Sequence, residues 1–308
     1  MPLLRSTFIG LSQNSTLRHF AEASTLGRRM SARFVAGFRI EDALSAATVL
    51  GSQGLAVTLD SLGENVATPD QAHQAAQRYH WILDSLAQSK MDANVSLKLT
   101  QMGMDLSPQV AADVVSGLVD HAVQAKSFVR VDMEGTAYTQ ATIDLVRALH
   151  AKPANRGHVG IVIQAYLRRS AADIAALLSD GIRIRLCKGA YQEPPDLAFP
   201  EKKDVDSNFI ALTQTLLKSG VFHGIATHDP AMIAATKNFV RAQAIDPASF
   251  EFQMLYGVRR DLQRSLVQEG FKVRVYVPFG EEWYPYFMRR LAERPANVLF
   301  LAKNMFRN

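Results

Sequence analysis

Val159-Gly-Ile-Val-Ile-Gln164 is a short apolar run, and Ile182-Arg-Ile-Arg-Leu186 is a second run further along the chain. Residues 171–179, which lie between them, have the apolar spacing of an amphipathic helix. A strand, a helix and a second strand in this order form the repeating unit of a parallel sheet. The unit decides the fold, because the same alternation continues through most of the chain.

The alternation begins at about residue 54. Predicted strands cover residues 55–59, 95–99, 128–133, 159–164, 182–186, 224–227, 250–255 and 272–277. Predicted helices cover residues 70–89, 108–126, 139–150, 171–179, 207–219, 231–244, 259–269 and 281–294. Eight strands, each followed by a helix, are typical of a (β/α)8 TIM-type barrel. No glycine-rich dinucleotide fingerprint follows the first strand, which argues against a Rossmann fold.

Two regions are expected from this pattern. Residues 1–50 form an N-terminal helical arm, with extra helices outside the barrel. Residues 51–308 form the barrel domain, and its C-terminal helix covers one end of the barrel. This spacing leaves no room for a separate second domain.

The composition limits the kind of protein. With 308 residues and 48% hydrophobic content, the chain can bury a large core. Its single cysteine, Cys187, excludes an intramolecular disulfide and a cysteine-rich metal site, which fits a reducing, cytoplasmic location. No apolar run approaches the roughly 20 residues that span a bilayer.

The formal net charge of +5 is a property shared with many nucleic-acid-binding proteins. Here the basic residues are scattered as isolated pairs, such as Arg168-Arg169 and Arg259-Arg260. Neither a recognition helix nor an RNA-binding aromatic motif accompanies them, so we expect no nucleic-acid partner. The first 35 residues hold five arginines against one acid, Glu22, a composition shared by transit peptides and basic helical arms. The i, i+3, i+4 spacing of Leu17, Phe20 and Ala21 favours the arm.

Alternation within the strands predicts which side chains face the barrel axis. Aliphatic residues such as Val95, Leu97 and Leu99 take the side that packs on the helices, and the residues between them face inward. The polar inward residues at the C-terminal ends of five strands are Lys98, Asp132, Gln164, Arg185 and Tyr276. Barrel enzymes have their active sites at that end. The cluster carries excess positive charge, which is costly to bury without a ligand.

The C-terminal helix predicted over residues 281–294 is ended by Pro295. Tyr286, Arg289, Arg290 and Glu293 fall on one of its faces. Each of two adjacent guanidinium groups can donate a pair of hydrogen bonds to a carboxylate or phosphate. The alternative is a solvated face with an internal Arg–Glu pair, worth a few tenths of a kcal/mol.

Two loops at the same end of the barrel carry polar groups. Lys188 and Gly189 follow the fifth strand, and such a turn can bring backbone N–H groups and an ammonium to a phosphate. Thr227 and His228 follow the sixth strand, but partners at metal-ligand spacing are missing, so we expect no metal. Cys187 has no paired histidine and is expected to be a small buried apolar residue.

An ordered set of motifs is similar to those of the flavin-dependent proline dehydrogenases, over about residues 34–302. The motifs are Leu62-Gly-Glu64, Val95-Ser-Leu-Lys-Leu-Thr100, Arg130-Val-Asp-Met-Glu134, Ile163-Gln-Ala-Tyr166, Arg185-Leu-Cys-Lys-Gly-Ala-Tyr191, Ala226-Thr-His228, Phe250-Glu-Phe-Gln-Met-Leu-Tyr-Gly257, and Tyr276 with Tyr286-Phe-Met-Arg-Arg290. The resemblance implies oxidation of L-proline to Δ1-pyrroline-5-carboxylate, the first step of proline catabolism to glutamate. It also implies hydride transfer from C5 of proline to N5 of FAD, electron transfer to a membrane quinone, and peripheral contact with the inner membrane.

The resemblance also implies roles for individual residues. The proline carboxylate would be held by Lys98, Arg289 and Arg290, and the ring would be flanked by Leu255, Tyr276 and Tyr286. Asp132 and Arg185 would be the catalytic residues, with Asp132 orienting basic groups and Arg185 beside flavin N5. Cofactor contacts would come from Met133, Gln164, Arg185, Lys188, Gly189, Ala190, Thr227 and His228. Glu64 would pair with Arg290 as a gate.

Two other functions stay open at this point. One is a different flavin-dependent barrel, such as a relative of methylenetetrahydrofolate reductase, although the Tyr–Arg–Arg helix suits a small carboxylate better than a folate. The other is a non-catalytic anion-binding barrel, which would purify without the yellow colour of a flavoprotein. The sequence leaves the oligomeric state open.

Overall fold

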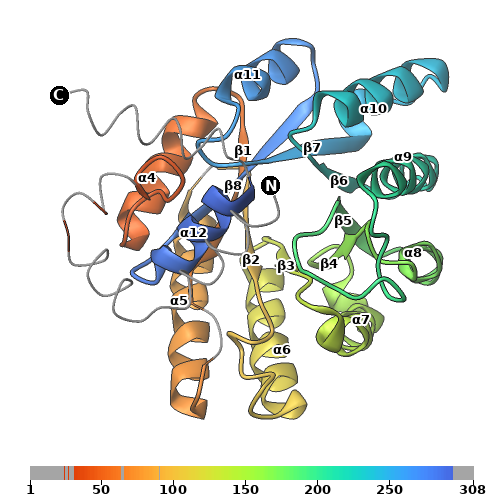
Figure 1. Ribbon diagram of the computed structural model, residues 1–308. Coiled ribbons are helices and arrows are strands. Elements are labelled where there is room, and N and C mark those ends of the chain that lie inside the picture. Colours follow the sequence, from red (N-terminus) through yellow and green to blue (C-terminus); the bar gives the residue numbers. More distant parts are fainter. Residues whose placement is uncertain (1–23, 25–26, 28–30, 64–65, 90, 294–308) are drawn as a thin grey trace.

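The structure is a computed structural model, and it describes residues 24, 27, 31–63, 66–89 and 91–293. Its strands form one closed, all-parallel barrel in which each strand pairs with the next and β8 pairs with β1 (Figure 1). The strands are β1 (Ala56–Ser61), β2 (Ala93–Leu97), β3 (Val129–Val131), β4 (Val159–Gln164), β5 (Arg183–Cys187), β6 (His223–Ala226), β7 (Phe250–Leu255) and β8 (Lys272–Phe279). The predicted (β/α)8 fold is confirmed.

Helices surround this barrel, and helix α12 lies next to β8 at one side of the ring of strands in the view of Figure 1. They are α4 (Ile40–Gly51), α5 (Pro69–Gln88), α6 (Pro108–Gln124), α7 (Thr136–Ala151), α8 (Ser170–Ser179), α9 (Lys202–Lys218), α10 (Pro230–Ala242), α11 (Arg260–Gln268) and α12 (Trp283–Glu293), with 3-10 turns at Pro153–Asn155 and Pro247–Ser249. In the part of the chain that the structure describes, no helix is long and apolar enough to cross a membrane.

Three helices begin with the same local chemistry. The side chains of Thr68, Ser107 and Asp229 each accept a hydrogen bond from a backbone N–H in the first turn of α5, α6 and α10. A proline follows each of these residues at the first helical position, where a missing N–H costs no hydrogen bond. The starts of these helices are therefore set by the sequence next to them.

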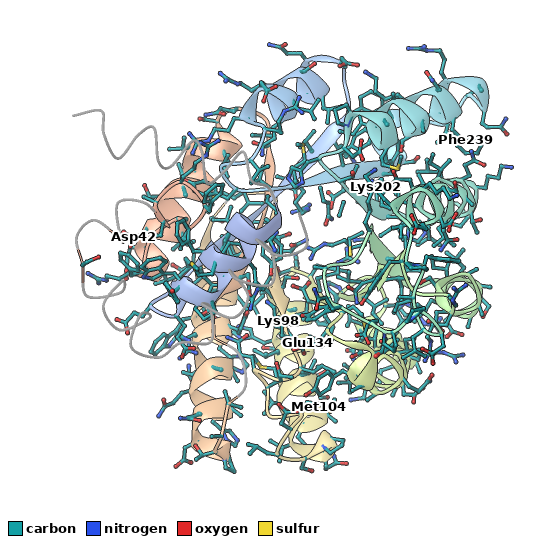
Figure 2. All side chains as sticks on the ribbon, in the orientation of Figure 1. Asp42, Lys98, Met104, Glu134, Lys202 and Phe239 are labelled. Carbon is teal, nitrogen blue, oxygen red and sulfur yellow. The ribbon has the colours of Figure 1, made fainter. Side chains whose placement is uncertain are left out.

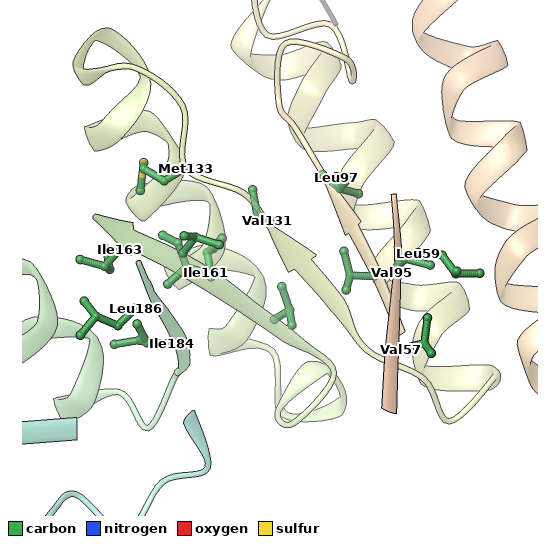
Figure 3. Close-up of a cluster of buried hydrophobic side chains, with 14 of the residues drawn as sticks. Val57, Leu59, Val95, Leu97, Val131, Met133, Ile161, Ile163, Ile184 and Leu186 are labelled. Atoms are coloured by element: carbon green, nitrogen blue, oxygen red, sulfur yellow. The ribbon is translucent and has the colours of Figure 1, made fainter. Parts of the chain in front are cut away.

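The apolar core lies between the barrel and its helices. Outward-facing strand residues, such as Val57, Leu59, Val95 and Leu97, are buried in one cluster with side chains of α5 and α6 (Figure 3). This confirms the predicted alternation. Helix α4 belongs to the same layer, because Ala43, Ala47 and Leu50 lie in that cluster. The predicted domain boundary after residue 50 is not tested by this packing, and most of the predicted arm lies outside the described residues.

Several boundaries differ from the predicted ones. Strand β2 ends at Leu97, two residues early, so Lys98 lies in the turn that follows it. Helix α9 begins at Lys202 rather than residue 207, and its first turns are joined by the Lys202–Asp206 ion pair, which has the favourable i, i+4 spacing. Strand β8 runs on to Phe279, because each of its residues from Arg274 onward pairs with β1.

The interior of the barrel is polar at its N-terminal end. Arg274 donates from Nε to both oxygens of Glu251 at 2.8 and 3.0 Å, and from Nη2 to Asp92 at 2.8 Å. Arg130 donates to the carbonyl oxygens of Ile161 and Arg183. Charged groups thus fill this end of the barrel, and Glu251 also accepts a hydrogen bond from Gln253, which lies further along the axis.

Candidate active site

A cavity of about 460 Å³ opens at the C-terminal ends of the strands, beneath α12. The structure places in its lining every predicted site residue that it describes, while Glu64 lies outside the described residues. These lining residues are Lys98, Asp132, Met133, Gln164, Arg185, Lys188, Gly189, Ala190, Thr227, His228, Leu255, Tyr276, Tyr286, Arg289 and Arg290. The shared cavity establishes where these residues lie, and their hydrogen bonds and charges bear on what each of them does.

Asp132, just beyond β3, is the centre of a hydrogen-bond network in this cavity. Its Oδ1 accepts from Ser96 Oγ at 2.5 Å and from Arg185 Nη1 at 2.8 Å, and its Oδ2 accepts from Tyr276 Oη at 2.9 Å. The ammonium of Lys98 lies 3.9 Å from Oδ2. A carboxylate with this many donors is held in one orientation, and it in turn orients the cations around it.

Tyr276 is a donor in this network. Burial raises the pKa of its hydroxyl well above the ordinary value, and the negative charges of Asp132 and Asp60 raise it further. The hydroxyl therefore keeps its proton at neutral pH and donates a hydrogen bond to Asp132. The same ring lies under the guanidinium of Arg185, 5.2 Å from the carbon of that group, so Tyr276 contacts both charges of the pair.

Asp60, at the end of β1, was not among the predicted site residues. It is completely buried, its Oδ2 lies 3.4 Å from Lys98 Nζ, and its Oδ1 accepts from Tyr79 Oη at 3.2 Å. The excess positive charge among the five inward residues is therefore compensated inside the barrel, because Asp60 joins Asp132 in balancing Lys98 and Arg185. The first strand was predicted to end at Leu59, one residue short of this carboxylate.

The loop after β5 is packed closely against the chain that follows β4. Gly189 has φ +110°, and a Cβ there would lie 2.2 Å from the ring of Tyr166. The preceding residue, Lys188, pairs with Asp206 and, at 2.7 Å, with Asp229. Burial alone would raise the pKa of Asp229, but the bonds from Lys188 and from the Ala231 N–H hold it below its ordinary value. Lys188 is thus a fixed part of the loop.

The predicted cofactor residues on the other strands also have internal contacts. His228 Nε2 accepts the backbone N–H of Leu255 at 2.8 Å, so this ring nitrogen carries no proton and the ring fixes the start of the β7–α11 loop. Gln164 Nε2 donates to the carbonyl of Glu134 at 2.9 Å. Both side chains remain in the cavity lining.

Helix α12 is held over the cavity by its apolar face. Trp283, Phe287 and Met288 are buried in a cluster with Phe34, Val35 and Leu62. The ring centroids of Phe34 and Phe287 lie 6.2 Å apart. The neighbouring face presents Tyr286, Arg289 and Arg290 to the cavity, and the guanidinium of Arg290 lies 5.0 Å from the ring centre of Tyr286. The side chain of Glu293, predicted for this face, lies outside the description.

Three further residues belong to this site and were not predicted. Ser96 bonds both Asp132 and Arg185, Gln253 accepts from Arg185 Nε, and Tyr191, which is 41% exposed, stands at the edge of the cavity. Figure 2 labels Lys98, a predicted member of the same site, next to Glu134. Gln253 could have been predicted from the alternation of inward and outward side chains along β7. The sequence around Ser96 gives no sign that it is more than a small buried residue.

The chain is similar to known proteins over nearly its whole length. The family model described as proline dehydrogenase matches residues 43–303. The chain is 41% identical to proline dehydrogenase 1 of Bacillus subtilis (strain 168), over 99% of this chain and all of the relative. It is 38% identical to proline dehydrogenase of Deinococcus radiodurans, over 90% of each chain.

A solved structure shares the fold. It is proline utilization A (PutA) from Bdellovibrio bacteriovorus inactivated by N-propargylglycine, with a TM-score of 0.83 and 24% identity. The match covers 99% of this chain and 38% of the longer PutA chain. At this level of identity the likeness supports the barrel fold alone.

Proposed function

The chain belongs to the proline dehydrogenase family of oxidoreductases, which oxidise proline in the first step of its catabolism, and we propose that it does so with noncovalently bound FAD and a membrane quinone. The observation that carries the proposal is the arginine-bearing helix α12 above the network of Asp132, Arg185 and Tyr276, in one cavity. L-Proline is the proposed substrate and Δ1-pyrroline-5-carboxylate the product.

The residues that line the cavity support a flavin cofactor. Met133 and Gln164 offer apolar and amide contacts for a ring system, and Arg185 offers a cation that is fixed at two nitrogens. The tightly packed turn at Gly189 and the residues Ala190, Thr227 and His228 line the side that would take the rest of the molecule. FAD, when bound, would accept the hydride from C5 of proline and pass the electrons to the quinone.

Lys188 has a different role in this proposal from the one that sequence reasoning gave it. Asp206 and Asp229 already neutralise its ammonium, and the exposed Lys202 shares both carboxylates. We therefore assign Lys188 to holding the β5–α9 loop in place. A phosphate would find little net positive charge there.

The substrate would lie between the barrel interior and α12. Lys98 and Arg185 are balanced by Asp60 and Asp132, and α12 adds the two guanidinium groups of Arg289 and Arg290. We propose that these arginines, with Lys98, hold the proline carboxylate. Leu255, Tyr276 and Tyr286 would flank the ring and exclude water, so the reaction needs positioning more than a strong base.

Glu64 and the N-terminal arm complete the proposal, although Glu64 and most of the arm lie outside the described residues. Glu64 would pair with Arg290 when substrate is bound, so Glu64→Ala is expected to raise KM or slow flavin reduction at unchanged FAD content. Turnover equal to the wild type would remove the gate.

The basic arm would contact an anionic membrane surface. Deletion of the first 30 residues, which leaves Phe34 and Val35 in place against α12, is therefore expected to weaken binding to anionic vesicles and to spare turnover with a soluble dye. Equal vesicle binding before and after the deletion would remove the arm from the proposal.

Anaerobic mixing tests the function directly. The purified protein should be yellow, and L-proline should bleach the flavin absorbance in the absence of oxygen. Acid precipitation should then release the flavin into the supernatant. A colourless protein, or a flavin that proline does not reduce, would contradict the proposed chemistry.

A further inference from the structure

Arg185 is held from several directions at the base of the cavity. Its Nη1 donates to Asp132 and, at 3.1 Å, to Ser96 Oγ. Its Nε donates to the side-chain oxygen of Gln253, and its guanidinium carbon, Cζ, lies 5.2 Å from the ring centre of Tyr276. A guanidinium is planar, so acceptors at Nε and at Nη1 together fix its plane as well as its location.

Gln253 itself has a fixed orientation. Its Nε2 donates to Glu251 Oε1 at 2.5 Å, and an amide nitrogen can donate but cannot accept. The oxygen of the same amide therefore has to face Arg185. Gln253 and Glu251 are 4% and 3% exposed, so water does not compete for these bonds.

Glu251 is in turn fixed by a buried arginine. Arg274 donates to both of its oxygens, and also to the backbone oxygen of Val57 at 2.8 Å and to Asp92. These bonds join β7 to β8, to β1 and to the loop before β2. The amide of Gln253 is thus anchored to the N-terminal end of the barrel, which lies away from the cavity.

A glycine makes the contact possible. Arg185 is on β5 and Gln253 on β7, so β6 separates their strands. Gly224 of β6 is paired in register with Arg185 on one side and Glu251 on the other. A Cβ at Gly224 would lie 2.4 Å from Nε2 of Gln253. The two side chains therefore meet across a strand position that carries no side chain.

We propose that Gln253 is a positioning residue: its amide holds the guanidinium of Arg185 in the plane and place from which that charge acts on the cofactor. The inference rests on the proposed flavin chemistry, in which Arg185 is the cation beside FAD. Removal of the amide would leave Asp132 and Ser96 to draw the guanidinium to one side. The reduced cofactor would then lose part of its stabilisation, while the carboxylate-binding groups on α12 would be unaffected.

Gln253→Met is the test variant, because methionine keeps the unbranched length and removes both polar groups. We expect KM for proline within about twofold of the wild type and flavin reduction slower by about tenfold, the loss of one hydrogen bond to a charged group. The flavin midpoint potential should fall by about 30 mV, which is a tenfold shift for a two-electron couple. Asn155→Leu is the matched control, since Asn155 is a buried amide that bonds Leu149 O outside the cavity.

A double variant separates positioning from general support of the fold. If Gln253 acts through Arg185, adding Gln253→Met to Arg185→Met should not shift the potential further. If Gln253→Met yields no folded protein, Gln253→Asn, which draws the amide back by one carbon, should lower the potential in the same direction.

Three results would overturn the inference. They are an unchanged potential in the Gln253 variants, an equal shift in Asn155→Leu, and additive shifts in the double variant. A wild-type protein without flavin would overturn the proposed function together with the inference. If the wild type binds flavin but Gln253→Met has the same midpoint potential as the wild type, the inference alone would be overturned.

Discussion

The charges of a few single residues determine where this cavity can bind an anion. Lys98 lies between the carboxylates of Asp60 and Asp132, at 3.4 and 3.9 Å, and Arg185 bonds Asp132 directly. Two cations and two carboxylates leave the floor of the cavity close to neutral. Arg289 and Arg290 also line the cavity, and a guanidinium group can donate two parallel hydrogen bonds to a carboxylate, so selection for a carboxylate is expected to depend on those residues.

Arg289→Met and Arg290→Met test that dependence. Methionine keeps much of the stem volume and removes the charge. If each guanidinium holds the proline carboxylate, its loss should cost roughly 1.5–3 kcal/mol and lower kcat/KM by about 10- to 150-fold. Steady-state rates with L-proline measure this effect, and lysine at either position should restore it only in part, because a point charge lacks the planar fork.

Prolinamide is the control substrate, since it has the same ring without a carboxylate charge. The wild type should prefer proline strongly, and both methionine variants should show a smaller preference. Equal losses with both substrates would mean that the arginines support α12 or the cofactor instead.

Among the elements, the β5–α9 loop depends on a single close contact. Gly189 combines φ +110° with a space in which a Cβ would lie 2.2 Å from the ring of Tyr166. The residues on either side of it line the cavity and are tied to α9 and α10 through Lys188. A shift of this loop would therefore reach the proposed cofactor site.

Gly189→Ala should show that connection. Backbone strain of about 1–3 kcal/mol, together with the clash, should displace the loop, and the purified protein should hold less FAD. Gly181→Ala is the matched control, because Gly181 also has positive φ (+73°) but would meet nothing within 4 Å. It should lose some stability and keep its flavin. Adding Tyr166→Leu to Gly189→Ala should restore flavin content, and failure to do so would argue against the contact as the cause.

Element order and inward alternation were readable from the sequence, because both follow from local periodicity. Alternation read along β2, β3, β5 and β8 gave Lys98, Asp132, Arg185 and Tyr276, and the cavity contains all four. Asp60 and Gln253 were missed on β1 and β7, because the alternation was not applied to these two strands, and the first strand was predicted to end one residue before Asp60. The partners of Lys188 were beyond prediction, since Asp206 and Asp229 reach it from different helices.

For the whole molecule, acid stability depends on histidines that the fold keeps neutral. His223, at the start of β6, is completely buried, and its Nδ1 accepts the backbone N–H of Ile184 at 3.0 Å. Burial, followed by the positive charge of Arg130, lowers its pKa to about 3. An exposed histidine of the unfolded chain titrates near 6.5. Between these pH values the unfolded state binds more protons, so the free energy of unfolding falls as the pH falls.

His223→Asn tests this coupling, because an asparagine oxygen can accept the Ile184 N–H but does not titrate. The variant should be less stable than the wild type at pH 7, and the gap should narrow by about 1.4 kcal/mol per pH unit below 6.5. Urea midpoints at pH 7, 6 and 5 measure the gap. His80 and His150, whose pKa values are also lowered by burial, contribute the same slope to both proteins. Exposed His73→Asn is the control and should leave the pH dependence intact. A constant gap between His223→Asn and the wild type would show that His223 does not set acid stability, whatever its burial.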